Sequence, residues 1–251
     1  MAQQRLDKII ASTGRYSRRE VKTLVREGRV LVDGRIAASA EDKCDPLTAR
    51  ISVNGEELFY REHTYVMLHK PAGVLSATED GRGETVLDLL APEYRKIGLF
   101  PVGRLDKDTE GLLLLTDDGA RAHDLLAPKK HVDKVSFART DGALDDADCK
   151  AFEQGITLGD GLECLPAKLE ILKSDAQSEA LITIREGKFH QIKRMLASRG
   201  KPVVYLKRLS MGSLTLDEGL SKGEYRLLTV EEIKNLRESG QFAQGKAGAD
   251  K

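Results

Sequence analysis

The fold of this chain is decided by the stretch Gly103-Arg104-Leu105-Asp106-Lys107-Asp108-Thr109-Glu110-Gly111-Leu112-Leu113-Leu114-Leu115-Thr116. Four successive leucines predict a strand that is buried on both faces, and the polar residues before them cannot enter the same core. Asp106 is therefore expected on a short loop that the core holds in place, as a positioned catalytic carboxylate requires. An aspartate before an apolar strand is otherwise a common turn or capping residue.

This pattern, GRLDxxTxGLLLLT, resembles the catalytic-loop signature of bacterial ribosomal-RNA pseudouridine synthases. A second stretch, EGKFHQIKRM at residues 186–195, is similar to the EGxxHQVKRM segment of the subgroup that acts on small-subunit ribosomal RNA. Residues 69–78, 206–212 and 220–229 also match, so the resemblance covers residues 4–235 in order.

Positive charge is concentrated at the N-terminus, although the 251-residue chain has 40 basic and 40 acidic residues. Residues 1–40 hold nine basic and four acidic side chains. A capping box, Ser17-Arg18-Arg19-Glu20, opens a predicted helix whose Arg18, Lys22 and Arg26 form one stripe. Such a stripe is usually a solvated face, but the segment resembles an RNA-binding module first described in a small-subunit ribosomal protein. RNA binding by Arg18, Lys22 and Arg26 is therefore expected.

The resemblance and the patterns together predict an α+β protein with two domains and a tail. Residues 1–60 form a small N-terminal α/β RNA-binding module, with a turn at Asn54-Gly55 and a linker near residues 55–63. Residues 61–236 form the catalytic domain, with a large mixed, mainly antiparallel sheet and a loop at His69–Gly73. Residues 237–251 are polar and rich in Gly and Ala, which predicts a disordered tail.

The resemblance implies that Asp106 is the catalytic carboxylate and that Arg104 and Lys193 orient it or hold phosphates. His190, Lys193 and Arg194 have the spacing of one helix face. Whether Asp106 attacks the sugar or removes a sugar proton is open from sequence alone.

One departure from the family pattern HxxKxYxV falls at residues 131–138, which read HVDKVSFA. Ser136 stands where the family has a tyrosine that stacks on the target base, and Phe137 follows it. Either the register is shifted and Phe137 supplies the ring, or the ring is missing. Adjacent residues of a strand point to opposite faces, which separates these alternatives.

The implied reaction converts a specific uridine of small-subunit ribosomal RNA to pseudouridine, on free RNA or in an assembly intermediate. Such an isomerisation needs no cofactor, and the sequence lacks metal-ligand spacings. Three widely spaced cysteines and the lack of a signal peptide or membrane span predict a cytoplasmic protein, expected to be a monomer. The alternatives are the same reaction on large-subunit RNA, or a non-catalytic ribosome-assembly factor.

Overall fold

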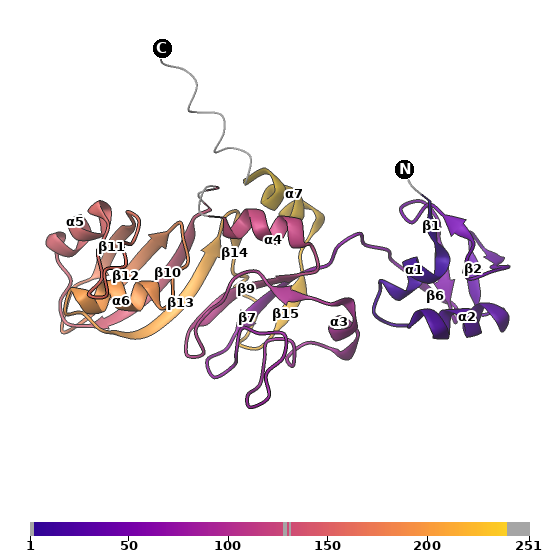
Figure 1. Cartoon of the computed structure of the whole chain (residues 1–251), viewed down its shortest axis with the longest axis horizontal. Helices are drawn as coiled ribbons and strands as arrows, with labels where there is room; N and C mark the ends of the chain where they lie inside the picture. The colour runs from indigo at the N-terminus through magenta and orange to yellow at the C-terminus, as the bar shows by residue number, and fades with distance from the viewer. Residues whose placement is uncertain (1–2, 128–129, 131, 240–251) are drawn as a thin grey trace, which may run out of the picture. The chain divides into compact units, whose positions relative to one another are not determined.

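The computed structural model describes residues 3–127, 130 and 132–239. The chain divides into two compact units, one of residues 1–64 with 90–99 and the other of residues 65–89 with 100–251 (Figure 1). Residues 240–251 of the predicted tail lie outside the described residues, whereas residues 237–239 continue a helix instead of beginning the tail.

The first unit packs short helices on a four-stranded antiparallel sheet. Its strand order is β3-β2-β5-β6, and a two-stranded β1-β4 ladder lies apart from this sheet. The elements are β1 (Gln4–Arg5), α1 (Leu6–Ala11), α2 (Arg18–Arg26), β2 (Val30–Val32), β3 (Arg35–Ile36), β4 (Lys43–Cys44), β5 (Ile51–Val53), β6 (Glu56–Leu58) and, from the inserted segment, α3 (Pro92–Ile97).

Local signals of the first unit form as the sequence predicts. Ser17 and Glu20 make the reciprocal capping box at the start of α2. Asp33 and Asn54, each followed by a glycine, have the positive φ angles that the tight hairpin turns β2–β3 and β5–β6 require. The predicted linker at residues 55–63 is wrong in part, because Glu56–Leu58 is strand β6 and pairs with β5.

The second unit contains a nine-stranded mixed sheet, as expected. Its order is β11-β12-β10-β13-β9-β7-β15, with β14 on β13 and β8 on β9. Every pair is antiparallel except β13–β9. The strands are β7 (Tyr65–Lys70), β8 (Phe100–Pro101), β9 (Glu110–Thr116), β10 (Lys134–Asp141), β11 (Lys168–Lys173), β12 (Gln177–Ile184), β13 (Val203–Met211), β14 (Leu214–Thr215) and β15 (Tyr225–Leu227).

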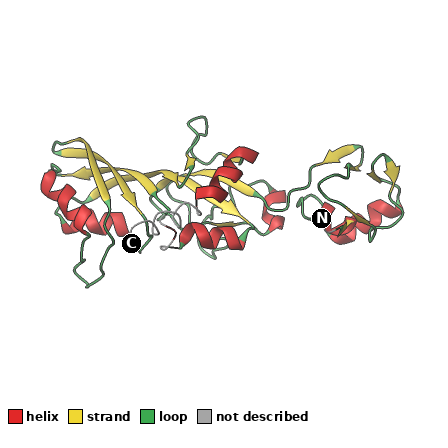
Figure 2. Cartoon of the chain, turned by 90° about the horizontal axis from the view of Figure 1, so that it is seen from above, coloured by secondary structure: helices red, strands yellow, loops and turns green. Residues whose placement is uncertain are grey.

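Helices cover two parts of this sheet, and Figure 2 shows the strands running through the unit beside them. One apolar core joins β10–β13 to α5 (Asp146–Gln154) and α6 (Gln191–Ser198). A second joins β7 and β9 to α4 (Gly119–Leu126) and α7 (Val230–Ser239). Leu112–Leu115 in β9 are fully buried, which confirms the two-faced strand.

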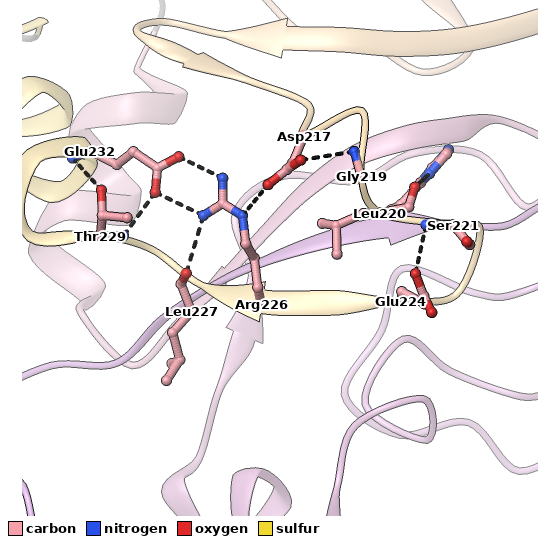
Figure 3. Close-up of polar contacts among 10 residues, drawn as sticks. Asp217, Gly219, Leu220, Ser221, Glu224, Arg226, Leu227, Thr229 and Glu232 are labelled. Atoms are coloured by element: carbon pink, nitrogen blue, oxygen red, sulfur yellow. Dashed lines mark hydrogen bonds and ion pairs between the residues drawn. The ribbon is translucent and has the colours of Figure 1, made fainter.

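An ionic network fastens the C-terminal helix to the sheet (Figure 3). Arg226 of β15 donates two hydrogen bonds of 2.8 Å to the Glu232 carboxylate and one of 2.5 Å to Asp217. These hydrogen bonds raise the pKa of Arg226 despite partial burial. Thr229 caps α7 by accepting from the Glu232 N–H at 3.1 Å. The network therefore links β15, α7 and the 217–221 loop.

Gly111 lies where β9 contacts β13, directly beside Arg208. Its φ is 106°, and a Cβ atom there would overlap the backbone of Arg208. Both a left-handed conformation and a close backbone approach therefore require glycine at the start of the leucine strand.

We predict that Gly111→Ala lowers the free energy of unfolding by more than about 3 kcal/mol, because steric overlap and backbone strain act together. Gly119→Ala is the matched control, since its Cβ would meet nothing within 4 Å. Urea unfolding of both variants measures the effect. Equal midpoints for the two variants would contradict the close approach at Gly111.

Candidate active site

The loop that carries Asp106 is held from beneath by the buried ammonium group of Lys70. Lys70 has no exposed surface and ends strand β7, so the predicted loop at His69–Gly73 begins two residues late, after Lys70. Its Nζ lies 2.9, 3.1, 3.2 and 2.9 Å from the carbonyl oxygens of Pro71, Asp106, Lys107 and Thr109. Burial lowers the pKa of Lys70 to about 8, against the opposing charges of Asp108 and Asp106.

Two further contacts fix the loop without using the Asp106 side chain. The Ser76 hydroxyl donates to the Leu105 carbonyl at 2.8 Å and accepts from the Leu105 N–H at 3.1 Å. The Gly73 N–H donates to the Lys107 carbonyl at 2.7 Å. The Asp106 carboxylate is therefore left available for other partners.

The Asp106 carboxylate faces the start of α6. Its Oδ2 lies 2.9 Å from Lys193 Nζ, and its Oδ1 lies 3.6 Å from His190 Nε2. Lys193 also contacts Asp108 Oδ1 at 2.5 Å. Burial acts to lower the pKa of Lys193, but hydrogen bonds and charges from Asp108 and Asp106 outweigh it and raise that pKa. The Asp106 side chain remains 24% exposed, so a substrate can reach it.

The structure separates residues that the sequence had grouped. His190 and Lys193 meet Asp106, but Arg194 pairs with Asp160 at 2.5 Å, so the predicted shared face is wrong for Arg194. Arg104 has an exposed side chain that lines the cavity over Asp106. The described ion pair with Asp106 comes from Lys193 and not from Arg104.

A cavity of about 570 Å³ lies over Asp106, within the usual range for small-ligand sites. Its wall includes Lys134, Ser136 and Arg208, all at least nine-tenths buried. Ser136 of β10 is opposite Arg208 of β13, and Arg208 is beside Gly111 of β9. Three adjacent strands therefore bring distant residues into one row.

The two buried cations Lys134 and Arg208 have no direct ion pair with a carboxylate among the described residues. The Arg208 Nη2 atom is also buried without an acceptor. Arg208 Nε donates to the Leu112 carbonyl at 2.7 Å. Burial lowers the pKa of Arg208 to about 10. Burial and the Arg208 charge lower the pKa of Lys134 to about 8, against the opposing charges of Asp133 and Glu186. Buried cations without an ion-pair partner favour a negative group in the cavity.

Ser136 and Phe137 point to opposite faces of β10. Ser136 lines the cavity, whereas the Phe137 ring lies edge-on to Tyr205 with centroids 6.2 Å apart. The Arg139 guanidinium lies 5.9 Å from the centre of the Phe137 ring. The shifted-register alternative, in which Phe137 supplies a ring to the site, is therefore wrong for this arrangement.

The basic stripe of the first unit is exposed along α2. Arg18, Lys22 and Arg26 are all solvent-accessible, and Lys22 lies 3.6 Å from Glu41. In the part of the chain that the structure describes, no three His, Cys, Asp or Glu side chains are grouped to hold a metal ion. Among the same residues, no helix has the length and apolar character needed to cross a membrane.

Sequence reasoning did not assign roles to Lys70, Lys134 and Arg208. Lys70 lay inside a motif already singled out, and Lys134 shares the face of Ser136 at the alternate strand position. Arg208 lay in the matching segment 206–212, but its place in the cavity depends on the β10–β13 register, which the sequence does not show.

A loop-borne carboxylate among cations, in a base-sized cavity, defines an enzyme site suited to an anionic substrate. The chain matches the RNA pseudouridylate synthase family over residues 64–198 and the S4 domain over residues 4–46. It is 49% identical over 235 residues to "Uncharacterized RNA pseudouridine synthase YtzG" of Bacillus subtilis, covering 93% of this chain and 98% of the relative.

Two other relatives are each 39% identical. They are ribosomal small subunit pseudouridine synthase A of Vibrio cholerae (92% of this chain, 99% of the relative) and ribosomal large subunit pseudouridine synthase B of Bacillus subtilis (93% and 96%). A crystal structure of a pseudouridylate synthase superposes with a TM-score of 0.64 at 37% identity, covering 93% of this chain and 99% of that one. The chain belongs to the RNA pseudouridine synthase family and carries an N-terminal S4 domain.

We predict that Lys70→Met lowers the free energy of unfolding by about 3 kcal/mol, because the apolar stem is kept while buried carbonyls lose their charged donor. Lys107→Met, at an exposed position of the same loop, should change it by less than about 0.5 kcal/mol. Urea unfolding compares the two variants. A Lys70 variant as stable as the Lys107 variant would show that the loop does not need the ammonium group.

Proposed function

We propose that this chain converts a specific uridine of small-subunit ribosomal RNA to pseudouridine, with Asp106 as the essential carboxylate. The reaction breaks the bond between uracil N1 and ribose C1′, turns the ring and joins C5 to C1′. The observation that carries the proposal is the Asp106–Lys193 pair at 2.9 Å in a cavity that can hold one flipped nucleotide.

Cleavage of the glycosidic bond builds positive charge at C1′, which a nearby carboxylate stabilises. Asp106 either attacks C1′ or removes a ribose proton. By both routes, the electron pair of the broken bond leaves with uracil, which becomes an anion. Lys134 and Arg208 line the cavity without carboxylate partners, so their charge favours that anion. When C5 bonds to C1′, the Asp106–C1′ bond breaks in the first route, or Asp106 returns the ribose proton in the second. The C5 proton is then released and a ring nitrogen is protonated, which leaves no net transfer.

Small-subunit RNA is the preferred substrate, and large-subunit RNA is the second candidate. Overall sequence identity does not distinguish between the two candidate substrates, because the small-subunit relative of Vibrio cholerae and the large-subunit relative of Bacillus subtilis are both 39% identical to this chain. The segments HQIKRM (residues 190–195) and KGEYRLLT (222–229) resemble the small-subunit subgroup. Mapping pseudouridine in ribosomal RNA from cells with and without this chain tests the choice. A site that disappears only from large-subunit RNA would overturn it.

We predict that Asp106→Asn reduces the single-turnover rate by at least a thousandfold while folding and RNA affinity change little, since the isosteric amide removes only the anion. Asp108→Asn is the matched control, because Asp108 contacts the same Lys193 and is 75% exposed. It should keep the rate within about tenfold. A rate above about a tenth of wild type for the Asp106 variant would exclude Asp106 as the essential carboxylate.

We propose that α2 docks the S4 domain on the RNA backbone. Replacing Arg18, Lys22 and Arg26 by Gln should weaken binding and lower the slope of log K against log salt by about 2 to 3, since each phosphate contact contributes about 0.7–0.9. A double Gln variant at Arg15 and Arg29, which pair with Glu56 and Glu27, is the control. An unchanged slope in the triple variant would rule out this docking face.

A further inference from the structure

An exposed aromatic ring stands at the mouth of the cavity. Phe189 is 75% exposed, although phenylalanine is among the residues most often buried. It lines the same cavity as Asp106 and directly precedes the α6 residues that contact the substrate site. Neither the chemistry at Asp106 nor the core of the fold uses this ring.

The ring is backed by a second ring and held in place. Phe189 stacks on the His190 imidazole with centroids 3.8 Å apart and an interplanar angle of 17°. His190 has a φ of 50°, which a residue other than glycine adopts uncommonly. The buried Gln191 side chain accepts from the Lys188 N–H at 3.1 Å and donates to Glu186 at 2.8 Å. These hydrogen bonds hold the turn on either side of Phe189, and the ring itself rests on His190.

The position of the Phe189 ring determines which nucleotide of the RNA it can contact. His190 Nε2, at the edge of the imidazole, is 3.6 Å from Asp106, and Phe189 covers one face of the same ring. The Asp106 contact and the Phe189 stack therefore use different sides of the His190 ring, and the 75% exposed Phe189 ring is open to a base that adjoins a uridine held at Asp106. Exposed Arg104 and Lys107 line the same cavity and attract phosphates. An aromatic face combined with cations is the arrangement that binds unpaired nucleotides.

We propose that Phe189, backed by His190, is a stacking platform for the unpaired nucleobase next to the target uridine. This inference rests on the proposed function, because it takes the target to lie against Asp106. The platform holds the strand open beside the cavity, so that the uridine is presented outside the base stack. It contributes to substrate binding and leaves the chemical step to the Asp106 loop.

The chain contains no tryptophan, so Phe189→Trp introduces a single fluorescent ring at the platform. Adding small-subunit ribosomal RNA should quench that fluorescence, since a base then stacks on the indole. Leu172→Trp is the control, because Leu172 is 52% exposed in the same unit and does not line the cavity. Quenching equal to that of the control would overturn the platform.

A short RNA that carries the mapped uridine gives the second test. Phe189→Ala should weaken binding by roughly 5- to 150-fold, the range for one lost base–aromatic stack. Removing the base at one nucleotide adjoining the target should weaken wild type equally and the variant no further. Full additivity at every adjoining nucleotide would overturn the inference.

Different results would overturn the stacking platform and the proposed function. Selective quenching without pseudouridine formation supports the platform and overturns the proposed function. Pseudouridine formation with wild-type binding by Phe189→Ala supports the proposed function and overturns the platform. Leu172→Ala provides the matched control for the binding measurements and should bind as wild type does.

Discussion

The active-site loop depends on one buried cation, the ammonium group of Lys70. Three N–H donors serve four carbonyl oxygens, three of which belong to the loop that carries Asp106. Because an unsatisfied buried acceptor is costly, the loop has little freedom to rearrange. Gly111 continues the constraint into the sheet, since it pairs with Lys70 on β7 and with Arg208 on β13. The carboxylate is thus positioned by backbone contacts and keeps its own oxygens for chemistry.

Part of the positive charge in the site has no carboxylate partner from the protein and is therefore available to a negatively charged substrate. Lys193 pairs with Asp106, whereas the wall cations Lys134 and Arg208 have no described carboxylate partner. Buried charge without a partner destabilises a folded protein, so its presence in a cavity indicates a functional demand. In the proposed reaction, a departing uracil anion meets that demand for a short time in each turnover, which is the form of stabilisation that accelerates a reaction.

Binding and chemistry are assigned to different kinds of surface. The residues that shape the reaction are buried or partly buried within one unit, whereas Phe189, Arg104 and the α2 stripe are exposed. Exposed cations act on phosphates over several ångströms and orient an RNA, but they carry little information about sequence. The proposed stacking of a base on Phe189 adds a local requirement for an unpaired base, so under these proposals the two kinds of contact together limit which uridine enters.

The sequence by itself determined the features that depend on near neighbours. These include the capping box at Ser17, the turn at Asn54-Gly55 and the buried strand Leu112–Leu115. Only the tertiary structure decided that β6 occupies the predicted linker and which residues share the cavity wall. Local patterns report on a few residues, whereas strand register joins residues about 70 to 100 positions apart, and a shift of one residue turns every side chain to the other face.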